Sequence, residues 1–223
     1  SPAVALLSRM MAEGSHGQTR YMTFERINPG PPRTDVSVLW DLAVHDVAII
    51  HHLTGESPIA VRASGMSQRS DGLAEAVFIH LEFEGGMQAR LHTSWLSSQK
   101  TRVATVFGSE ATLVYDDLAE YQIRRVGAPR DNRVHAKDGD VIELAYGQGT
   151  EESFRPAGAE PLYAECAAFL SAIRREADPP NGIRHALEVI GILEAAERSM
   201  GLGGEMVALG TEHGEPGTRT AST

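Results

Sequence analysis

The segment that decides the fold is residues 74–95, which read AEAVFIHLEFEGGMQARLHTSW. The runs on both sides of Glu84-Gly85-Gly86 alternate between apolar and polar side chains, as strands with one buried face do. The two glycines between the runs suit a tight turn. The segment therefore predicts a β-hairpin.

The same period-two pattern extends outward from this hairpin along the chain. It recurs at residues 19–28, 59–65, 102–107 and 112–115, with short turn-rich links between the later runs. Short links favour antiparallel pairing. We expect a meandering, mainly antiparallel sheet of about six strands. The polar stretch 126–160 is expected to be a surface excursion that holds one more strand near residues 141–144.

Helical spacing of apolar residues marks four further segments. A first helix follows Ser1-Pro2 and stops at Gly14, and others are expected at residues 36–54, 161–177 and 184–200. Cys166 lies on the apolar stripe of the third of these, so we expect it in the core. The helices should pack on one face of the sheet, which gives an α+β fold with an open second face available for dimerisation.

The composition is that of a folded, water-soluble chain, with 42% hydrophobic and 22% charged residues among 223. Thirty Asp and Glu against 20 Lys and Arg give a formal charge of -10, which argues against binding to nucleic acid. Cys166 is the single cysteine, so an internal disulfide is excluded. No apolar run approaches the roughly 20 residues that span a bilayer, and we expect a cytoplasmic protein without membrane contact.

The expected helix at residues 36–54 carries the pattern that points to chemistry. Asp41 and His45 are four residues apart, so on an α-helix they lie on one face. We expect Asp41 to orient the imidazole of His45 and to raise its pKa, which suits a general acid or base. The alternative is a local ion pair or a core histidine without a catalytic role.

Further polar side chains collect near this helix. Arg26 and Asn28 precede it in a loop-rich stretch, and loops of this kind often line sites. Trp95 lies with Lys100 and Arg102 at a strand-turn-strand junction, where cations and a flat ring suit a sugar or a phosphate. The alternative there is a solvated hairpin with a buried tryptophan.

Histidines raise one other possibility. His51 and His52 follow His45 on the expected helix, and His80 and His92 fall in strands, but their spacing matches no known metal site. Scattered histidines are the simpler interpretation. A metal-dependent hydrolase using His45, His51 and Asp41 is a remote alternative.

Eight motifs follow one another along the chain: Glu25-Arg26-x-Asn28-x-Gly30-Pro31, Asp35-Val36, Trp40-Asp41-Leu42-Ala43-x-His45-Asp46, Ser94-Trp95, Lys100-x-Arg102, Gly108-Ser109, Tyr115-Asp116-Asp117 and Glu160-Pro161-Leu162. Taken together, these motifs resemble the C-terminal, substrate-binding domain of the glucose-fructose oxidoreductase/inositol dehydrogenase/MocA family. The resemblance covers residues 1–209 and is strongest to a branch in which some members oxidise nucleotide-linked amino sugars.

The resemblance implies that residues 1–209 form a substrate-binding and oligomerisation domain, with residues 210–223 as a disordered tail. Related enzymes use NAD or NADP, bound mainly by an N-terminal Rossmann domain, to oxidise a hydroxyl of a sugar, polyol or nucleotide-linked sugar. Their open sheet is commonly a subunit interface, which implies a homodimer or homotetramer here. His45 and Asp41 fall on the family's catalytic pair, and the implied substrate contacts are Arg26, Asn28, Trp95, Lys100 and Arg102.

Some expected family features are absent from this sequence. It has no Gly-x-Gly-x-x-Gly turn between a strand and a helix, and nothing matches the catalytic Lys of the family's Glu-Lys-Pro motif. Val44 stands where many relatives carry Gly or Pro. We expect a truncated dehydrogenase that is inactive as this chain alone. The alternative is a non-catalytic sugar-binding or oligomerisation module that lacks the redox half.

Overall fold

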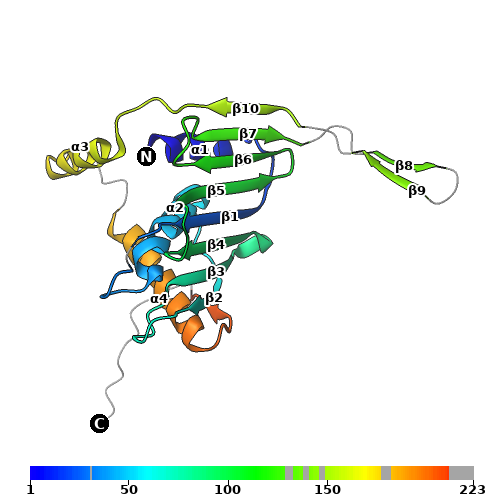
Figure 1. Ribbon diagram of the computed structural model, residues 1–223. Coiled ribbons are helices and arrows are strands. Elements are labelled where there is room, and N and C mark those ends of the chain that lie inside the picture. The colour runs from blue at the N-terminus through cyan, green and yellow to red at the C-terminus, as the bar shows by residue number, and fades with distance from the viewer. Residues whose placement is uncertain (31, 129–132, 138–140, 146–148, 177–181, 211–223) are drawn as a thin grey trace, which may run out of the picture.

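The body of the protein is a nine-stranded sheet in this computed structural model, which describes residues 1–30, 32–128, 133–137, 141–145, 149–176 and 182–210. Its strands are β1 (Thr19–Ile27), β2 (Ala60–Met66), β3 (Ala76–Glu82), β4 (Gln88–Ser94), β5 (Thr101–Gly108), β6 (Ala111–Asp116), β7 (Ile123–Gly127), β10 (Glu151–Phe154) and β11 (Val207–Ala208). They lie in the order β10-β7-β6-β5-β1-β4-β3-β2-β11 (Figure 1).

The sheet is antiparallel except at its centre, where β1 and β4 run parallel. The expected hairpin is confirmed: β3 and β4 pair with Phe78 opposite His92, and a short 3-10 turn at Glu84–Gly86 joins them. Gly85 has a positive φ of 79°, which explains the preference for glycine at this turn.

The expectation of about six strands was too low. The six predicted strands are present, but β7, β10 and β11 extend the sheet, so residues 126–160 are not wholly a surface excursion. The edge strand β10 buries none of its side chains, and a strand without a buried face has no period-two signal. The strand expected near residues 141–144 is confirmed as β9 (Val141–Ala145), which pairs with β8 (Arg133–Lys137) in a hairpin apart from the main sheet (Figure 1).

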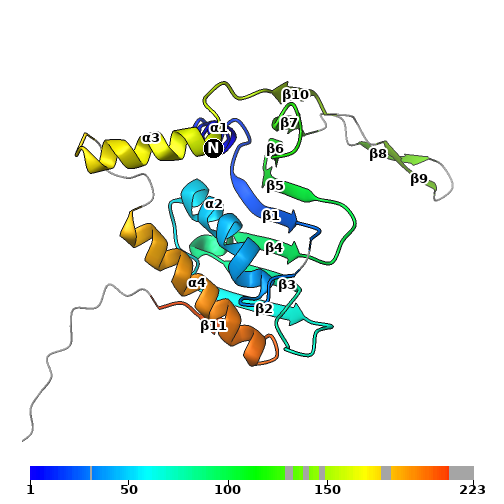
Figure 2. The ribbon, with the colours of Figure 1, turned by 60° about the vertical axis from the view of Figure 1, so that its left-hand side comes forward.

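Three helices cover one face of the sheet, as Figure 2 shows. They are α1 (Pro2–Ala12), α2 (Val44–Thr54) and α4 (Ile183–Gly201). Their apolar sides and the inner side chains of the strands form one continuous core, which includes Leu7, Val47 and Leu193 from the helices and Phe24 and Leu91 from the sheet. No helix of the described residues lies on the opposite face of the sheet, and the predicted α+β architecture is confirmed.

Helix α3 (Pro161–Ile173) begins as expected, with the Glu160 carboxylate accepting a hydrogen bond from the Tyr163 N–H. It buries no side chain against the rest of the described chain. Cys166 is exposed, so the expectation that it lies in the core was wrong. Spacing identifies an apolar stripe on a helix but not what covers it. The apolar side chains of this stripe are at least half exposed: Leu162, Tyr163, Phe169, Leu170 and Ile173.

The glycine-rich stretch after α4 is a helix end and turn, as predicted, with positive φ at Gly203 and Gly204. None of the described helices combines the length and the apolar character needed to cross a bilayer. The expected tail at residues 210–223 lies outside the described residues beyond Gly210.

The junction between α4 and the sheet depends on one buried hydroxyl. Ser199 Oγ accepts a hydrogen bond from the Ala63 N–H at 2.8 Å and donates one to the Glu205 carbonyl at 2.5 Å. Because both backbone groups would lose their partner, we expect Ser199→Ala to lower the free energy of unfolding by about 1–3 kcal/mol. Urea unfolding followed by circular dichroism measures this, with the exposed Ser98→Ala as control. Equal midpoints for the two variants would contradict the prediction.

Candidate functional site

The candidate site lies at the edge of the sheet where the parallel strands β1 and β4 end. Both carboxyl ends meet there because the strands run in the same direction. A backbone hydrogen bond of 3.0 Å from the Asn28 N–H to the Ser94 carbonyl joins the two ends. The chain then returns over this edge and enters α2, so strand ends and helix start bring polar side chains together.

The entry to α2 differs from the predicted α-helix at residues 36–54. Helical structure begins at Leu39, and Leu39–Ala43 is a π-helical turn, which holds one residue more than an α-helical turn between its hydrogen-bonded ends. Asp41 lies inside this turn. Its Oδ2 accepts a hydrogen bond of 3.1 Å from Trp95 Nε1, and no hydrogen bond joins it to His45 among the described residues. The expected orienting contact between Asp41 and His45 is therefore not formed.

Trp95 has a different role from the exposed platform that the sequence suggested. It is only 5% exposed, and its indole N–H positions the Asp41 carboxylate. The other oxygen of Asp41 lies 3.5 Å from Arg33 Nη1, while Arg33 also pairs with Asp35. The alternative of a buried tryptophan is the one the structure bears out, and it leaves Asp41 anchored from two sides.

As a whole residue His45 is exposed near the start of α2, but the surrounding protein removes part of the water from its imidazole and brings charges from several elements close to it. Partial burial is the main cause that lowers its pKa below the usual 6.5, and the cation of Arg26 lowers it further. The carboxylates of Asp46 and Asp41 oppose these effects without overcoming them. Asp41 therefore acts on the pKa of His45 in the predicted direction, but the net shift is downward because burial and Arg26 outweigh it. A pKa below 6.5 leaves the imidazole mainly neutral at neutral pH, the form that can accept a proton.

Beneath His45, Asp46 forms an ion pair that the sequence did not predict. Arg26 Nε and Nη2 lie 2.9 Å and 2.7 Å from the same Asp46 oxygen, Oδ1. Asp46 is only 3% exposed, and burial raises its pKa against the opposing effect of Arg26. Arg26, expected to bind substrate, thus has an intramolecular partner. The two residues belong to separate sequence motifs, and only the fold shows that their side chains meet.

Arg102 is held in a similar way beside Arg26. The two arginines are register partners on β5 and β1, and Arg102 Nη1 lies 3.1 Å from Asp117 Oδ2. Tyr115 donates a hydrogen bond of 2.8 Å to the other oxygen of Asp117. Although burial alone would raise the pKa of Asp117, Tyr115 and Arg102 together lower it. The two arginines and their two aspartate partners therefore form two neighbouring ion pairs at this edge.

The remaining expected contacts lie at the rim of this cluster. Asn28 is half-buried at the end of β1, and Lys100 is exposed in the link between β4 and β5, away from any acidic partner among the described residues. Asp41, Trp95, Arg26 and Arg102 are thus brought to one edge with His45, while Lys100 stands outside their contacts.

The histidines form pairs rather than a metal site. His51 lies 2.5 Å from Glu188 and 2.9 Å from His185, at the contact of α2 with α4. His80 and His92 each lie 3.4 Å from a glutamate on the open face of the sheet. No three His, Cys, Asp or Glu side chains of the described residues are placed to share an ion. The residues named for the hydrolase alternative do not assemble.

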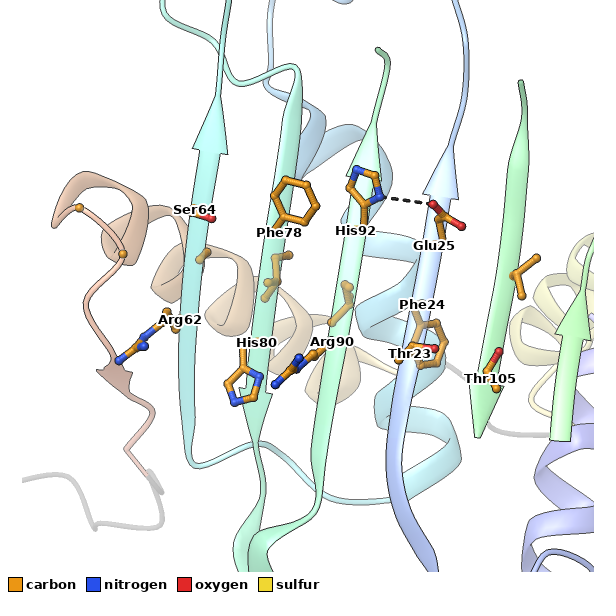
Figure 3. Close-up of a pocket in the computed structure, with 16 residues that line it drawn as sticks. Thr23, Phe24, Glu25, Arg62, Ser64, Phe78, His80, Arg90, His92 and Thr105 are labelled. Atoms are coloured by element: carbon orange, nitrogen blue, oxygen red, sulfur yellow. Dashed lines mark ion pairs between the residues drawn. The ribbon is translucent and has the colours of Figure 1, made fainter. Parts of the chain in front are cut away.

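The open face of the sheet carries a shallow groove of about 720 Å³, shown in Figure 3. Arg62, His80 and Arg90 form one register row across β2, β3 and β4, and their side chains project from this face (Figure 3). In the next row Phe78 stacks on His92 with ring centroids 4.4 Å apart. This groove lies on the side of the sheet opposite to His45.

The indole of Trp95 offers a direct test of the site's construction. We expect Trp95→Phe to lower the free energy of unfolding by about 2 kcal/mol, because the partly buried Asp41 carboxylate loses a donor. Trp40→Phe is the matched control, since its N–H donates to Glu197 at 3.2 Å in an exposed setting. Urea unfolding followed by circular dichroism compares them. An equal decrease in the free energy of unfolding for the two variants would show that the Trp95–Asp41 hydrogen bond contributes no more than the exposed Trp40–Glu197 one.

Residues 4–114 match the family described as the GFO/IDH/MocA C-terminal domain. The chain is 31% identical over 109 residues to UDP-N-acetylglucosamine 3-dehydrogenase from Acidithiobacillus ferrooxidans, a match covering 48% of this chain and 34% of that protein.

Solved structures share the fold over most of the chain. The aldose-aldose oxidoreductase from Caulobacter crescentus complexed with glycerol has a TM-score of 0.71 and 19% identity, covering 92% of this chain and 60% of its own. The WlbA dehydrogenase from Bordetella pertussis in complex with NADH and UDP-GlcNAcA has a TM-score of 0.67 and 16% identity, covering 93% and 60%.

Proposed function

Because the chain is a member of the GFO/IDH/MocA C-terminal domain family over residues 4–114, we propose that it is the substrate-binding half of an NAD(P)-dependent oxidoreductase. The substrate would be a sugar, polyol or nucleotide-linked sugar that is oxidised at a hydroxyl. The observation that carries this proposal is the exposed His45, kept neutral at an edge where Asp41, Arg26 and Arg102 converge.

The chain spans about three-fifths of the length of the solved proteins it resembles, and the matched segment about a third of the curated relative. Its described residues do not fit a dinucleotide. The glycines at residues 201–204 follow a helix instead of leading from a strand into one, which is the arrangement that cradles a pyrophosphate. We therefore assign to this chain the handling of substrate and proton, and place the cofactor on a domain outside it.

The described residues support a specific division of labour. A neutral imidazole at the site can take the proton of a substrate hydroxyl as the hydroxyl carbon is oxidised. Asp41, fixed by Trp95, is placed to accept a hydrogen bond from a second hydroxyl. Arg102 is less buried than Arg26, so it is the better candidate for direct contact with substrate.

A nucleotide-linked sugar is the substrate class we favour. The 31% identical relative is named for UDP-N-acetylglucosamine, and the WlbA dehydrogenase was solved with UDP-GlcNAcA. Lys100, exposed at the rim with Asn28 nearby along the same edge, supplies a cation that suits a diphosphate.

Turnover in the full-length gene product tests the catalytic proposal. With NAD+ or NADP+ and a panel of sugars and UDP-sugars, we expect His45→Ala to lower kcat by at least about 100-fold, because the proton acceptor is lost. Cofactor binding should be unchanged. His52→Ala, an exposed histidine on the same helix, is the control.

The possible outcomes separate the alternatives. Retained turnover in His45→Ala would refute the assignment of His45. No turnover by the wild type with any substrate, together with binding of a UDP-sugar, would support the non-catalytic binding module instead.

We also propose that the open face of the sheet joins two copies of this chain. Phe78 is 50% exposed and Tyr21 42% exposed on this face, where Tyr21 stacks on Phe107 with centroids 4.2 Å apart. Exposed aromatic pairs on a face without helices are costly in water, and a second sheet would cover them.

Association can be measured on the chain itself by analytical ultracentrifugation. We expect a dimer or tetramer for the wild type and a monomer for Phe78→Glu, since burying a carboxylate at the interface is unfavourable. Leu118→Glu is the control, because Leu118 is equally exposed but lies in the turn after β6. A monomeric wild type at micromolar concentration would refute this interface.

A further inference from the structure

The Arg26–Asp46 contact is built more tightly than a surface ion pair. The side chains of Arg26 and Asp46 are 11% and 5% exposed. Both Nε and Nη2 of the guanidinium converge on Asp46 Oδ1, while Oδ2 is buried without a partner in the described structure. A buried charge pair with an unused acceptor is an expensive arrangement for stability alone.

The position of this pair relates it to His45. Asp46 is the next residue after His45, in the first turn of α2, and Arg26 is the penultimate residue of β1. The pair therefore ties the start of α2 to the sheet at the residue adjacent to the imidazole. It also leaves the Arg26 cation beneath the helix, unavailable to a substrate unless Asp46 releases it.

We propose that Arg26 and Asp46 are a positioning pair for His45. The ion pair with Asp46 fixes the Arg26 cation beside the imidazole and keeps it from binding a substrate. This inference rests on the proposed function of His45 for its catalytic meaning, but the geometry of the pair does not. It assigns to Arg26 a role different from the substrate contact expected from the sequence.

Charges from each neighbouring element define what the pair contributes. Arg26 on β1 and Arg102 on β5 disfavour a proton on His45, whereas Asp46 on α2 and Asp41 in the π-helical turn favour one. Beyond them, Asp117 and Tyr115 at the end of β6 hold Arg102 in place. Loss of the Arg26 cation should therefore raise the pKa of His45, and loss of the Asp46 carboxylate should lower it.

The test is an NMR titration of the histidine side chains in this chain, with His52 as the internal reference. Arg26→Gln removes a cation, so the pKa of His45 should rise by roughly one pH unit. Asp46→Asn removes an anion and should lower it. The double variant removes both charges and should return the pKa of His45 close to the wild-type value. If one single variant unfolds, the sign of the shift in the other still tests the proposal.

Enzyme kinetics on the full-length gene product provide the second readout. Arg26→Lys keeps the charge but loses the two-nitrogen contact to Asp46 Oδ1, so we expect kcat to fall about tenfold with KM little changed. A substrate ligand would instead show a raised KM with kcat retained, and that result would overturn the positioning role.

The two proposals fail separately. Unchanged titration of His45 in both single variants, Arg26→Gln and Asp46→Asn, would refute the pair's influence and leave the His45→Ala experiment to judge the function. Opposite shifts in the single variants with full turnover in His45→Ala would keep the electrostatic coupling but overturn its catalytic purpose.

Discussion

The parallel pairing of β1 with β4 is the constraint on which the rest of the structure depends. Every other neighbour in the main sheet is antiparallel, so this pair requires the chain to cross the sheet after β1 before it builds β2, β3 and β4. The crossing segment carries the π-helical turn and α2, which lie on the helix-covered face. Because both strands end at the same edge, the crossing begins where Asn28 is hydrogen-bonded to Ser94, and it places Asp41 and His45 at that edge.

Local signals predicted the elements whose burial is one-sided. The alternation in residues 74–95 and the glycines at 85 and 86 identified the hairpin, and helical spacing identified α1, α3 and α4 within a few residues of their bounds. For α2 it gave the correct end but not the start, because a π-helical turn precedes Val44. The edge strand β10 was missed because neither of its faces is buried. The exposure of Cys166 was missed because an apolar stripe does not reveal whether a partner covers it.

The side-chain contacts of the candidate site were predicted less well than its helices and strands. The sequence identified His45, Asp41 and the cations around them, because charged and aromatic residues cluster along the chain there. The spacing predicted a contact between Asp41 and His45, whereas Asp41, in the π-helical turn, accepts a hydrogen bond from Trp95. Arg26 and Asp46 are 20 residues apart in the sequence, and their contact depends on the fold. The predicted rise in the pKa of His45 failed for the same reason. Asp41 was expected to dominate, but burial and the Arg26 cation have the larger effects and lower the pKa.

The π-helical turn at Leu39–Ala43 also bears on how this segment tolerates insertions and deletions. A π-turn contains one residue beyond the α-helical repeat, so losing a single residue within it would convert the segment to a regular α-helix. Each α-helical residue turns the axis by about 100°. With α2 held against the sheet by its core side chains, such a deletion would swing Trp40 and the preceding loop around the helix by that angle. The number of residues at this point therefore fixes the direction in which the preceding loop approaches the candidate site, and homologues that differ here by one residue should place that loop differently.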